Sequence, residues 1–288
     1  MFSGSIVALV TPFKNGEVDY EKLRELVSYH LENGTNGIVP VGTTGESPTL
    51  SSDEKYKVIK TVVETVKGKV PVIAGTGTNS TKTTIEQTKV AKELKADGAL
   101  IVTPYYNKPT QEGLYRHYEA IAKSVSIPIV IYNVPGRTSV NILPETVARL
   151  SKIKNISTIK EASGDIEQIK KIFSLCGITV LSGDDALTFS VMQFGGKGVI
   201  SVVANIIPRE VSQLCSALNS GDMKKGKELH TKFSNLFKAL FIETNPIPVK
   251  TAMELMGMMG CELRLPLCEM GKDNREKLKS ALKEYSLI

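Results

Sequence analysis

The chain has 288 residues, of which 41% are hydrophobic and 23% charged, a composition typical of a globular protein with a substantial core. Its 36 basic and 30 acidic residues give a net charge of +6, but the lysines are spread through helical segments such as 52–69 and 223–238, which argues against a nucleic-acid-binding tract. The first residues lack a signal-peptide pattern and no window approaches about 18 uninterrupted apolar residues, so we expect a cytoplasmic protein with no membrane span.

Short runs rich in valine and isoleucine alternate with longer amphipathic segments along the chain. Strands are expected at 5–10, 37–41, 70–75, 98–103, 128–133, 155–160, 179–182 and 198–203. Helices are expected at 19–32, 52–66, 81–95, 113–124, 144–150, 165–175, 184–194 and 208–218. Apolar strands joined by helices indicate a parallel sheet covered on its outer side, and eight such units predict an α/β protein with a closed (β/α)8 TIM barrel rather than an open sheet.

The last part of the chain shows no strand pattern. Residues 221–288 predict three helices, broken by Asn245-Pro246-Ile247-Pro248 and by Met259-Gly260. We therefore expect a catalytic barrel over residues 1–220 and a helical extension over residues 221–288, which is an appendage rather than a second catalytic domain.

The cysteines and histidines give no sign of a metal site. The four cysteines form no Cys-x-x-Cys pair, and the three histidines lie far from them and from one another in the sequence. We expect no metal, no cofactor and no disulfide framework.

Lys160 ends the sixth predicted strand and is followed by a loop that starts at Glu161. A TIM barrel has its active site at the C-terminal ends of its strands. A lysine held there in a dry pocket can present a neutral amine that attacks a carbonyl, although most lysines are solvated surface charges. The Schiff-base interpretation is favoured by the side chains expected at other strand ends, namely Thr43, Thr44, Tyr106, Tyr132 and Arg137.

Two of these strand ends suggest how a substrate would be held. The turn at 42–47 has glycines that allow backbone N–H groups and two hydroxyls to face an anion such as a carboxylate, although a polar turn that only caps the next helix has the same composition. The segment 132–138 combines the Tyr132 phenol, which can transfer protons, with the Arg137 guanidinium, which can bind a carboxylate. Alone, Arg137 would more often form a surface ion pair.

Three motifs in this order resemble those of the dihydrodipicolinate synthases, within the pyruvate-dependent aldolase superfamily. They are Gly42-Thr43-Thr44-Gly45-Glu46, Tyr132-x-x-Pro135-x-Arg137 and Lys160-Glu161-Ala162-Ser163-Gly164-Asp165, and the resemblance covers essentially the whole chain. It implies condensation of pyruvate with L-aspartate-4-semialdehyde, a step toward diaminopimelate and lysine. It also implies a homo-oligomer, a tetramer built from tight dimers, in which Tyr106 reaches the neighbouring subunit's site.

The resemblance further implies a role for each site residue. Lys160 forms the imine with pyruvate, while Thr43 and Thr44 bind the pyruvate carboxylate. Tyr132 is the general acid and base, linked through Thr44 to Tyr106 in a proton relay. Arg137 binds the carboxylate of the semialdehyde. Two further positions are expected to line the site with backbone groups: Gly183 and Ile200.

Three other functions share some of these sequence features. A sialic-acid lyase or sugar-keto-acid aldolase would share Lys160 and Tyr132, but a cation at Arg137 suits a short substrate with a free carboxylate. A phosphate- or nucleotide-binding barrel would need a glycine-rich anion site, for which residues 194–198 are a weak candidate better explained by close backbone packing before the eighth strand. Gly75-x-Gly77 is equally weak, because it lacks the third glycine of a dinucleotide-binding fingerprint. The pI of about 9.0 leaves nonspecific nucleic-acid binding open.

The sequence also predicts weak or absent feedback inhibition by L-lysine. Family members that lysine inhibits bind it with residues after the Gly-Thr-Thr-Gly-Glu loop and after the third strand. Ser47, Asn79 and Tyr105 match that pocket, but Ser52 and Lys55 replace its histidine-type side chains and Thr83 replaces its glutamate. The substitutions remove a carboxylate and add a cation beside a cationic ligand, which disfavours binding unless other residues compensate.

Overall fold

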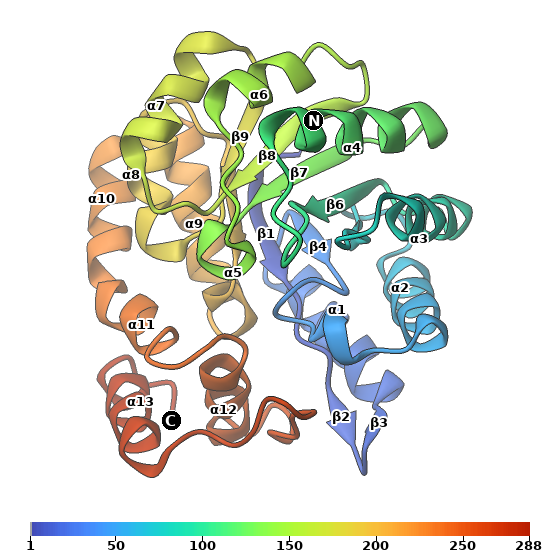
Figure 1. Ribbon diagram of the computed structural model, residues 1–288. Helices are drawn as coiled ribbons and strands as arrows, with labels where there is room; N and C mark the ends of the chain where they lie inside the picture. Colours follow the sequence, from blue (N-terminus) through green and yellow to red (C-terminus); the bar gives the residue numbers. More distant parts are fainter. Residues whose placement is uncertain (1) are drawn as a thin grey trace.

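The computed structural model describes residues 2–288 and contains an eight-stranded parallel sheet surrounded by helices (Figure 1). The sheet order is β4-β1-β10-β9-β8-β7-β6-β5, and a parallel bridge between Ile38 and Val72 joins its first and last strands. The sheet therefore closes, and the predicted (β/α)8 barrel is confirmed. The strands are β1 (Gly4–Ala8), β4 (Gly37–Val39), β5 (Ile73–Gly75), β6 (Gly98–Val102), β7 (Ile129–Asn133), β8 (Ile156–Glu161), β9 (Thr179–Ser182) and β10 (Gly198–Ser201).

Helices cover the outside of the barrel, and several begin at side-chain caps that the sequence supplies. Ser51 and Glu54 form a capping box at the start of α2, while Asp19, Ser80, Thr110 and Asp165 cap other helices with side-chain oxygens. Each helix turns an apolar face toward the strands. These helices are α1 (Tyr20–Glu32), α2 (Ser52–Val66), α3 (Thr81–Glu93), α4 (Gln111–Ser124), α6 (Pro144–Leu150), α7 (Ile166–Leu175), α8 (Thr188–Gln193) and α9 (Pro208–Asn219).

Glycines allow the backbone to pack closely near the strands. A Cβ on Gly75 would lie 2.1 Å from the backbone oxygen of Val41, and one on Gly198 would lie 2.1 Å from the backbone oxygen of Gly4. Such distances are impossible for a side chain, so only glycine fits at both positions. The interpretation of residues 194–198 as close backbone packing is confirmed at Gly198.

Some elements differ from the prediction. A short hairpin, β2 (Phe13–Lys14) and β3 (Glu17–Val18), was missed because each strand has only two residues, although its Asn15-Gly16 turn, with φ of 54° and 83°, is a hairpin signal. Strand β8 includes Glu161, which was expected to start the loop. Residues 184–194 form not one helix but a 3-10 turn, η2 (Asp185–Leu187), followed by α8.

The prediction of three helices in the extension was wrong, because the structure has four. They are α10 (Met223–Lys232), α11 (Ser234–Ala239), α12 (Ile247–Leu255) and α13 (Lys272–Glu284). The chain turns between α10 and α11 at Phe233, a buried residue that no glycine or proline announces. Side chains of the extension, among them Leu236, Leu240 and Ala252, belong to the same hydrophobic cluster as the outer face of the barrel.

The extension also contacts a segment near the N-terminus of the chain. The loop after α12 lies beside the β2–β3 hairpin (Figure 1), where the guanidinium of Arg264 donates to the backbone oxygen of Gly16 over 2.7 Å. The extension thus contacts the β2–β3 hairpin, which follows β1, as well as the side of the barrel.

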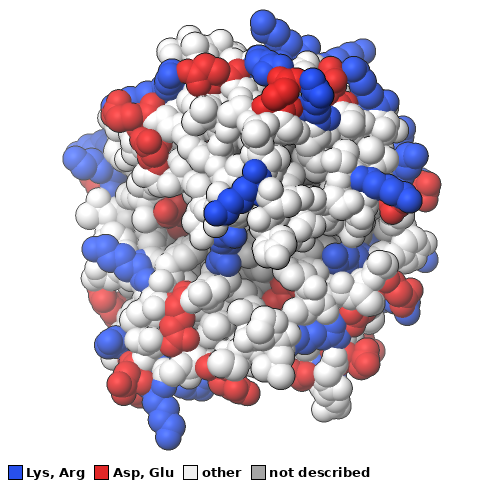
Figure 2. All heavy atoms as spheres, in the orientation of Figure 1, with Lys and Arg blue, Asp and Glu red and all other residues white. Residues whose placement is uncertain are grey.

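The surface carries charges of both signs. In the view of Figure 2, basic and acidic side chains are intermixed, with no tract of a single sign across this face. Among residues 2–288, no helix combines the length and apolar character needed to cross a membrane.

Candidate active site

Lys160 lies near the C-terminal end of β8, with its side chain inside the mouth of the barrel. The residue is only 6% exposed, and its Nζ lies 4.1 Å from the centroid of the Tyr132 ring on the neighbouring strand β7. It lines a cavity of about 140 Å³. No carboxylate within residues 2–288 forms an ion pair with its amine. An amine in this setting has an aromatic neighbour but no counter-charge, which suits a nucleophile.

The next residue, Glu161, is held away from this amine. Successive side chains of a strand point to opposite faces, and Glu161 accepts hydrogen bonds from the Asn133 amide at 3.0 and 3.1 Å and from the Ser163 backbone N–H at 2.7 Å. Burial raises the pKa of the Glu161 carboxyl, and these hydrogen bonds oppose the shift. The carboxylate therefore serves a polar network behind the site rather than neutralising Lys160.

The turn after β4 brings Thr43 and Thr44 to the same cavity. Backbone bonds from Gly45 N and Ser47 N to the Gly42 oxygen, 3.1 and 3.3 Å long, close the turn. Thr44 is 2% exposed, and its Oγ1 accepts a 2.9 Å hydrogen bond from the Asn245 amide. The predicted juxtaposition of these threonines with Lys160 is present.

Arg137 lies in α5 (Pro135–Thr138), the short helix that follows β7, and lines the cavity together with Tyr132. Its Nη2 donates to the backbone oxygen of Asn245 over 3.1 Å. In the part of the chain that the structure describes, its guanidinium pairs with no carboxylate. The alternative role of Arg137, a surface ion pair, is therefore not found among these residues, and the cation lines a cavity that can take an anionic substrate.

Of the three remaining predicted site residues, one lies beside the Lys160 side chain and two do not line its cavity. Gly183 is close to the amine, since a Cβ there would lie 3.2 Å from Lys160 Cε and 2.6 Å from the Cβ of Ala162. Ile200 is 1% exposed and packs inside the barrel, and it is not among the residues that line the cavity. Tyr106 is 89% exposed with a φ of 73°, and it lines neither this cavity nor the neighbouring one.

A second cavity, of about 290 Å³, adjoins the first and shares Thr43, Tyr132 and Arg137 with it. It extends to Ser47, Lys55 and Tyr105, three of the positions compared above with the lysine pocket. Lys55 also lines a third cavity of about 230 Å³ with Ser52, Thr83 and Glu86. Burial lowers the pKa of Lys55. Ser52, Lys55 and Thr83, the three positions at which the sequence departs from the lysine pocket, thus line this third cavity. Glu86 is the acidic side chain that lines it.

Sequence reasoning missed the contribution of the extension. Asn245 and Phe241 line the cavity of Lys160, as does Asp184 after β9. The break at Asn245-Pro246-Ile247-Pro248 was recognised only as the end of a helix. A polar residue in a proline-bounded loop was the available signal, but nothing in the sequence placed that loop at the mouth of the barrel.

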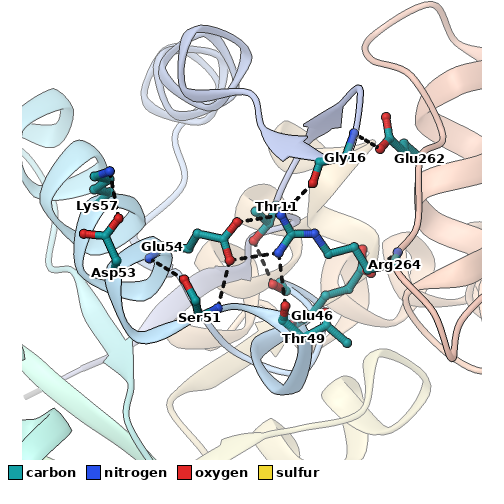
Figure 3. A network of polar contacts seen from close by, with 11 residues as sticks. Thr11, Gly16, Glu46, Thr49, Ser51, Asp53, Glu54, Lys57, Glu262 and Arg264 are labelled. Atoms are coloured by element: carbon teal, nitrogen blue, oxygen red, sulfur yellow. Dashed lines mark hydrogen bonds and ion pairs between the residues drawn. The ribbon is translucent and has the colours of Figure 1, made fainter.

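A network of charged and polar groups fastens the extension to the same turn (Figure 3). Lys250 Nζ contacts Glu46 Oε1 at 2.6 Å, and both side chains are buried, at 0% and 1% exposure. Burial lowers the pKa of the Lys250 amine, and attraction to Glu46 opposes that shift. Arg264 donates to the Thr49 backbone oxygen over 3.0 Å and pairs with Glu54.

Among residues 2–288, no cluster of three or more histidine, cysteine, aspartate or glutamate side chains could hold a metal ion. The groups that line the cavity of Lys160 include an amine, two hydroxyls, a phenol and a guanidinium. Such groups can form an imine with a carbonyl, move protons and bind carboxylates.

Comparisons with known proteins match the chain over its full length. The model of the dihydrodipicolinate synthetase family matches residues 1–285. A 4-hydroxy-tetrahydrodipicolinate synthase of Geobacter metallireducens is 61% identical, with 100% of both chains covered. The crystal structure of a dihydrodipicolinate synthase of Thermotoga maritima has a TM-score of 0.98 at 52% identity, covering 100% of both chains. A structure of the Acinetobacter baumannii enzyme complexed with pyruvate has a TM-score of 0.98 at 50% identity, again covering 100% of both chains.

Proposed function

The chain belongs to the dihydrodipicolinate synthetase family, and we propose that Lys160 is the residue on which its reaction takes place. The reaction is the condensation of pyruvate with L-aspartate-4-semialdehyde, which makes the protein a lyase of the diaminopimelate route to lysine. The observation that carries the role of Lys160 is a buried amine 4.1 Å from the centroid of the Tyr132 ring, which forms no ion pair with any carboxylate of residues 2–288.

The first half of the reaction needs an amine and a proton carrier. The Lys160 amine attacks the ketone carbon of pyruvate, and the oxygen leaves as water after protonation, giving an iminium. The iminium acidifies the pyruvate methyl group, which loses a proton to form an enamine. Tyr132, beside the amine, is the group proposed to carry these protons, with Thr44 next to it in the cavity.

The second half joins two carbon atoms. The enamine carbon attacks the aldehyde carbon of the semialdehyde, and the aldehyde oxygen gains a proton. Arg137 is proposed to bind the carboxylate of this second substrate, because its guanidinium lines the cavity without an acidic partner among the described residues. Thr43 and Thr44 are proposed to bind the pyruvate carboxylate.

The proposed assembly is a tetramer built from tight dimers. Tyr106, 89% exposed, and Leu265, 81% exposed, are large apolar side chains on loops of the catalytic face. A neighbouring subunit would cover them and would bring its own Tyr106 to this site, completing the relay through Thr44 and Tyr132. We also propose that the barrel over 1–220 and the extension over 221–288 act as one catalytic unit in the cytoplasm.

Borohydride reduction in the presence of pyruvate tests the role of Lys160. Peptide mass mapping should find the reduced adduct on Lys160 together with loss of activity, and no adduct when pyruvate is omitted. Lys250 is an internal control, because it is also buried but is paired with Glu46. An adduct on Lys250 or on a surface lysine, with Lys160 unmodified, would refute the proposal.

A further inference from the structure

Asn245, in the loop between α11 and α12, forms hydrogen bonds with two residues of the candidate active site. Its Nδ2 donates to Thr44 Oγ1 over 2.9 Å, and its backbone oxygen accepts from Arg137 Nη2 over 3.1 Å. The side chain is 5% exposed, and its Oδ1 is buried without a hydrogen-bond partner within residues 2–288. We propose that Asn245 is a positioning residue that sets the direction in which the Thr44 hydroxyl passes a proton.

The direction follows from what each group can donate. A threonine hydroxyl has one proton and two acceptor lone pairs, whereas an amide nitrogen only donates. Thr44 Oγ1 must therefore accept from Asn245, and its own proton must point elsewhere. The Asn245 amide is the hydrogen-bond partner that the structure gives this oxygen within the described chain. Since Thr44 and Tyr132 line one cavity, the Thr44 hydroxyl is free to donate its proton toward that cavity.

The same amide favours the transfer itself. As the Thr44 hydroxyl gives up its proton, negative charge develops on Oγ1, and a fixed N–H donor in a site with little water stabilises that charge. The proton goes to the acceptor in the cavity, and Thr44 regains one from the next carrier of the relay. No bond other than O–H is made or broken at Thr44.

The loop acts on Arg137 through its backbone and on Thr44 through its side chain. A substitution of the Asn245 side chain leaves the backbone oxygen in place, so it tests the Thr44 contact alone. Asn245 Oδ1 argues against a purely structural role for the side chain. A buried acceptor without a hydrogen-bond partner lowers stability, so an apolar residue would fill the same space at lower cost.

The inference rests on the proposed role of Lys160 and is tested with Asn245→Asp, which keeps the shape but replaces the donor with an acceptor. The ionised carboxylate would take the Thr44 proton in a hydrogen bond, so kcat at pH 8 should fall about 100-fold, within the usual range for one proton carrier. As the pH falls, the introduced carboxyl gains a proton and can donate again, so kcat relative to the unsubstituted protein should rise. A purely structural role would give no such recovery.

Two further variants separate the effect from charge repulsion and from damage to the extension. Asn245→Leu removes the donor without adding charge, and its kcat should fall at every pH without recovery. Asn274→Asp makes the same chemical change on α13, where the amide donates to Glu243 Oε1 over 2.8 Å, and should leave kcat unchanged. Thermal unfolding of each variant reports its folding.

Imine trapping at Lys160 distinguishes the possible failures. Asn245→Asp should still give the reduced pyruvate adduct at saturating pyruvate, because imine formation does not depend on the direction of the hydrogen bond at Thr44. A kcat within twofold of the unsubstituted value, a loss that is equal at all pH values, or a loss of the adduct in this variant alone would each overturn the role of Asn245. Failure to label Lys160 in the unsubstituted protein would overturn the proposed function instead.

Discussion

Replacing Lys250 with methionine should lower the unfolding free energy more than the loss of an exposed ion pair does. The Lys250 amine lies 2.6 Å from Glu46 Oε1 and also donates to the backbone oxygens of Thr11 and Glu262, at 3.1 and 2.5 Å. Lys250→Met keeps most of the apolar volume but leaves a buried carboxylate and two carbonyls without their donor. Glu46 would retain one hydrogen bond, from the Arg264 backbone N–H at 3.1 Å.

The expected loss is about 3–5 kcal/mol of unfolding free energy, the usual cost of removing one partner of a buried ion pair. For a domain of this size that lowers Tm by roughly 10 °C. Lys57→Met is the matched control, since Lys57 lies 2.8 Å from Asp53 on α2 with both side chains largely exposed (Figure 3), and its loss should cost less than about 1 kcal/mol.

Unfolding is followed by circular dichroism, because the chain has no tryptophan for fluorescence. The protein concentration is kept fixed, because the stability of an oligomer depends on it. The double variant Glu46→Gln with Lys250→Met removes both charges, so it should be more stable than Lys250→Met alone. The reasoning is refuted if Lys250→Met unfolds within about 1 kcal/mol of the unsubstituted protein, or if the double variant is less stable than the single one.

Three further outcomes are expected. Arg137→Ala should raise KM for the semialdehyde at least about 10-fold and leave imine trapping with pyruvate intact, and equal loss for both substrates would contradict a dedicated clamp. Titration of L-lysine into a coupled assay should give no half-inhibition at submillimolar concentration, because Lys55 and Thr83 stand where a cationic ligand needs acceptors; submillimolar inhibition would mean that other groups compensate. Burial raises the pKa of Asp185 to about 6, so the folded state holds its proton more tightly than the unfolded chain, and the stability this lends is lost as pH rises through about 4 to 6. The stability advantage over Asp185→Asn, measured by denaturant unfolding, should therefore shrink by roughly 1–3 kcal/mol across that range, and a constant difference would argue against burial as the cause of the shift.

The barrel could be predicted because its signals are local and repeated. Each strand is a short apolar run and each helix has a polar face, so the order of the elements is visible without knowing their contacts. Lys160, Tyr132 and Thr44 could also be brought together, because the ends of parallel strands meet at one face of a barrel. The structure places all three on one cavity.

What could not be predicted depends on contacts between distant segments. Asn245 meets Thr44 across 201 positions of sequence, and Lys250 meets Glu46 across 204. No periodicity reports such pairs, and a buried lysine looks like any other lysine in a basic chain. The turn at Phe233 was missed for a related reason, since tertiary packing bends the helix there without a glycine or proline.

The buried pair of Glu46 and Lys250 has a consequence for how the protein is made. A ribosome synthesises Glu46 about 200 residues before Lys250, so a nascent barrel carries an acidic group whose counter-charge does not yet exist. Until the partner emerges from the exit tunnel, burial of that carboxylate would leave an uncompensated charge, so we expect the turn bearing Thr43 and Thr44 to pack only after Lys250 is available. The extension also supplies Asn245, which bonds to Thr44, so the complete surroundings of the Lys160 amine are expected only once the extension has been synthesised.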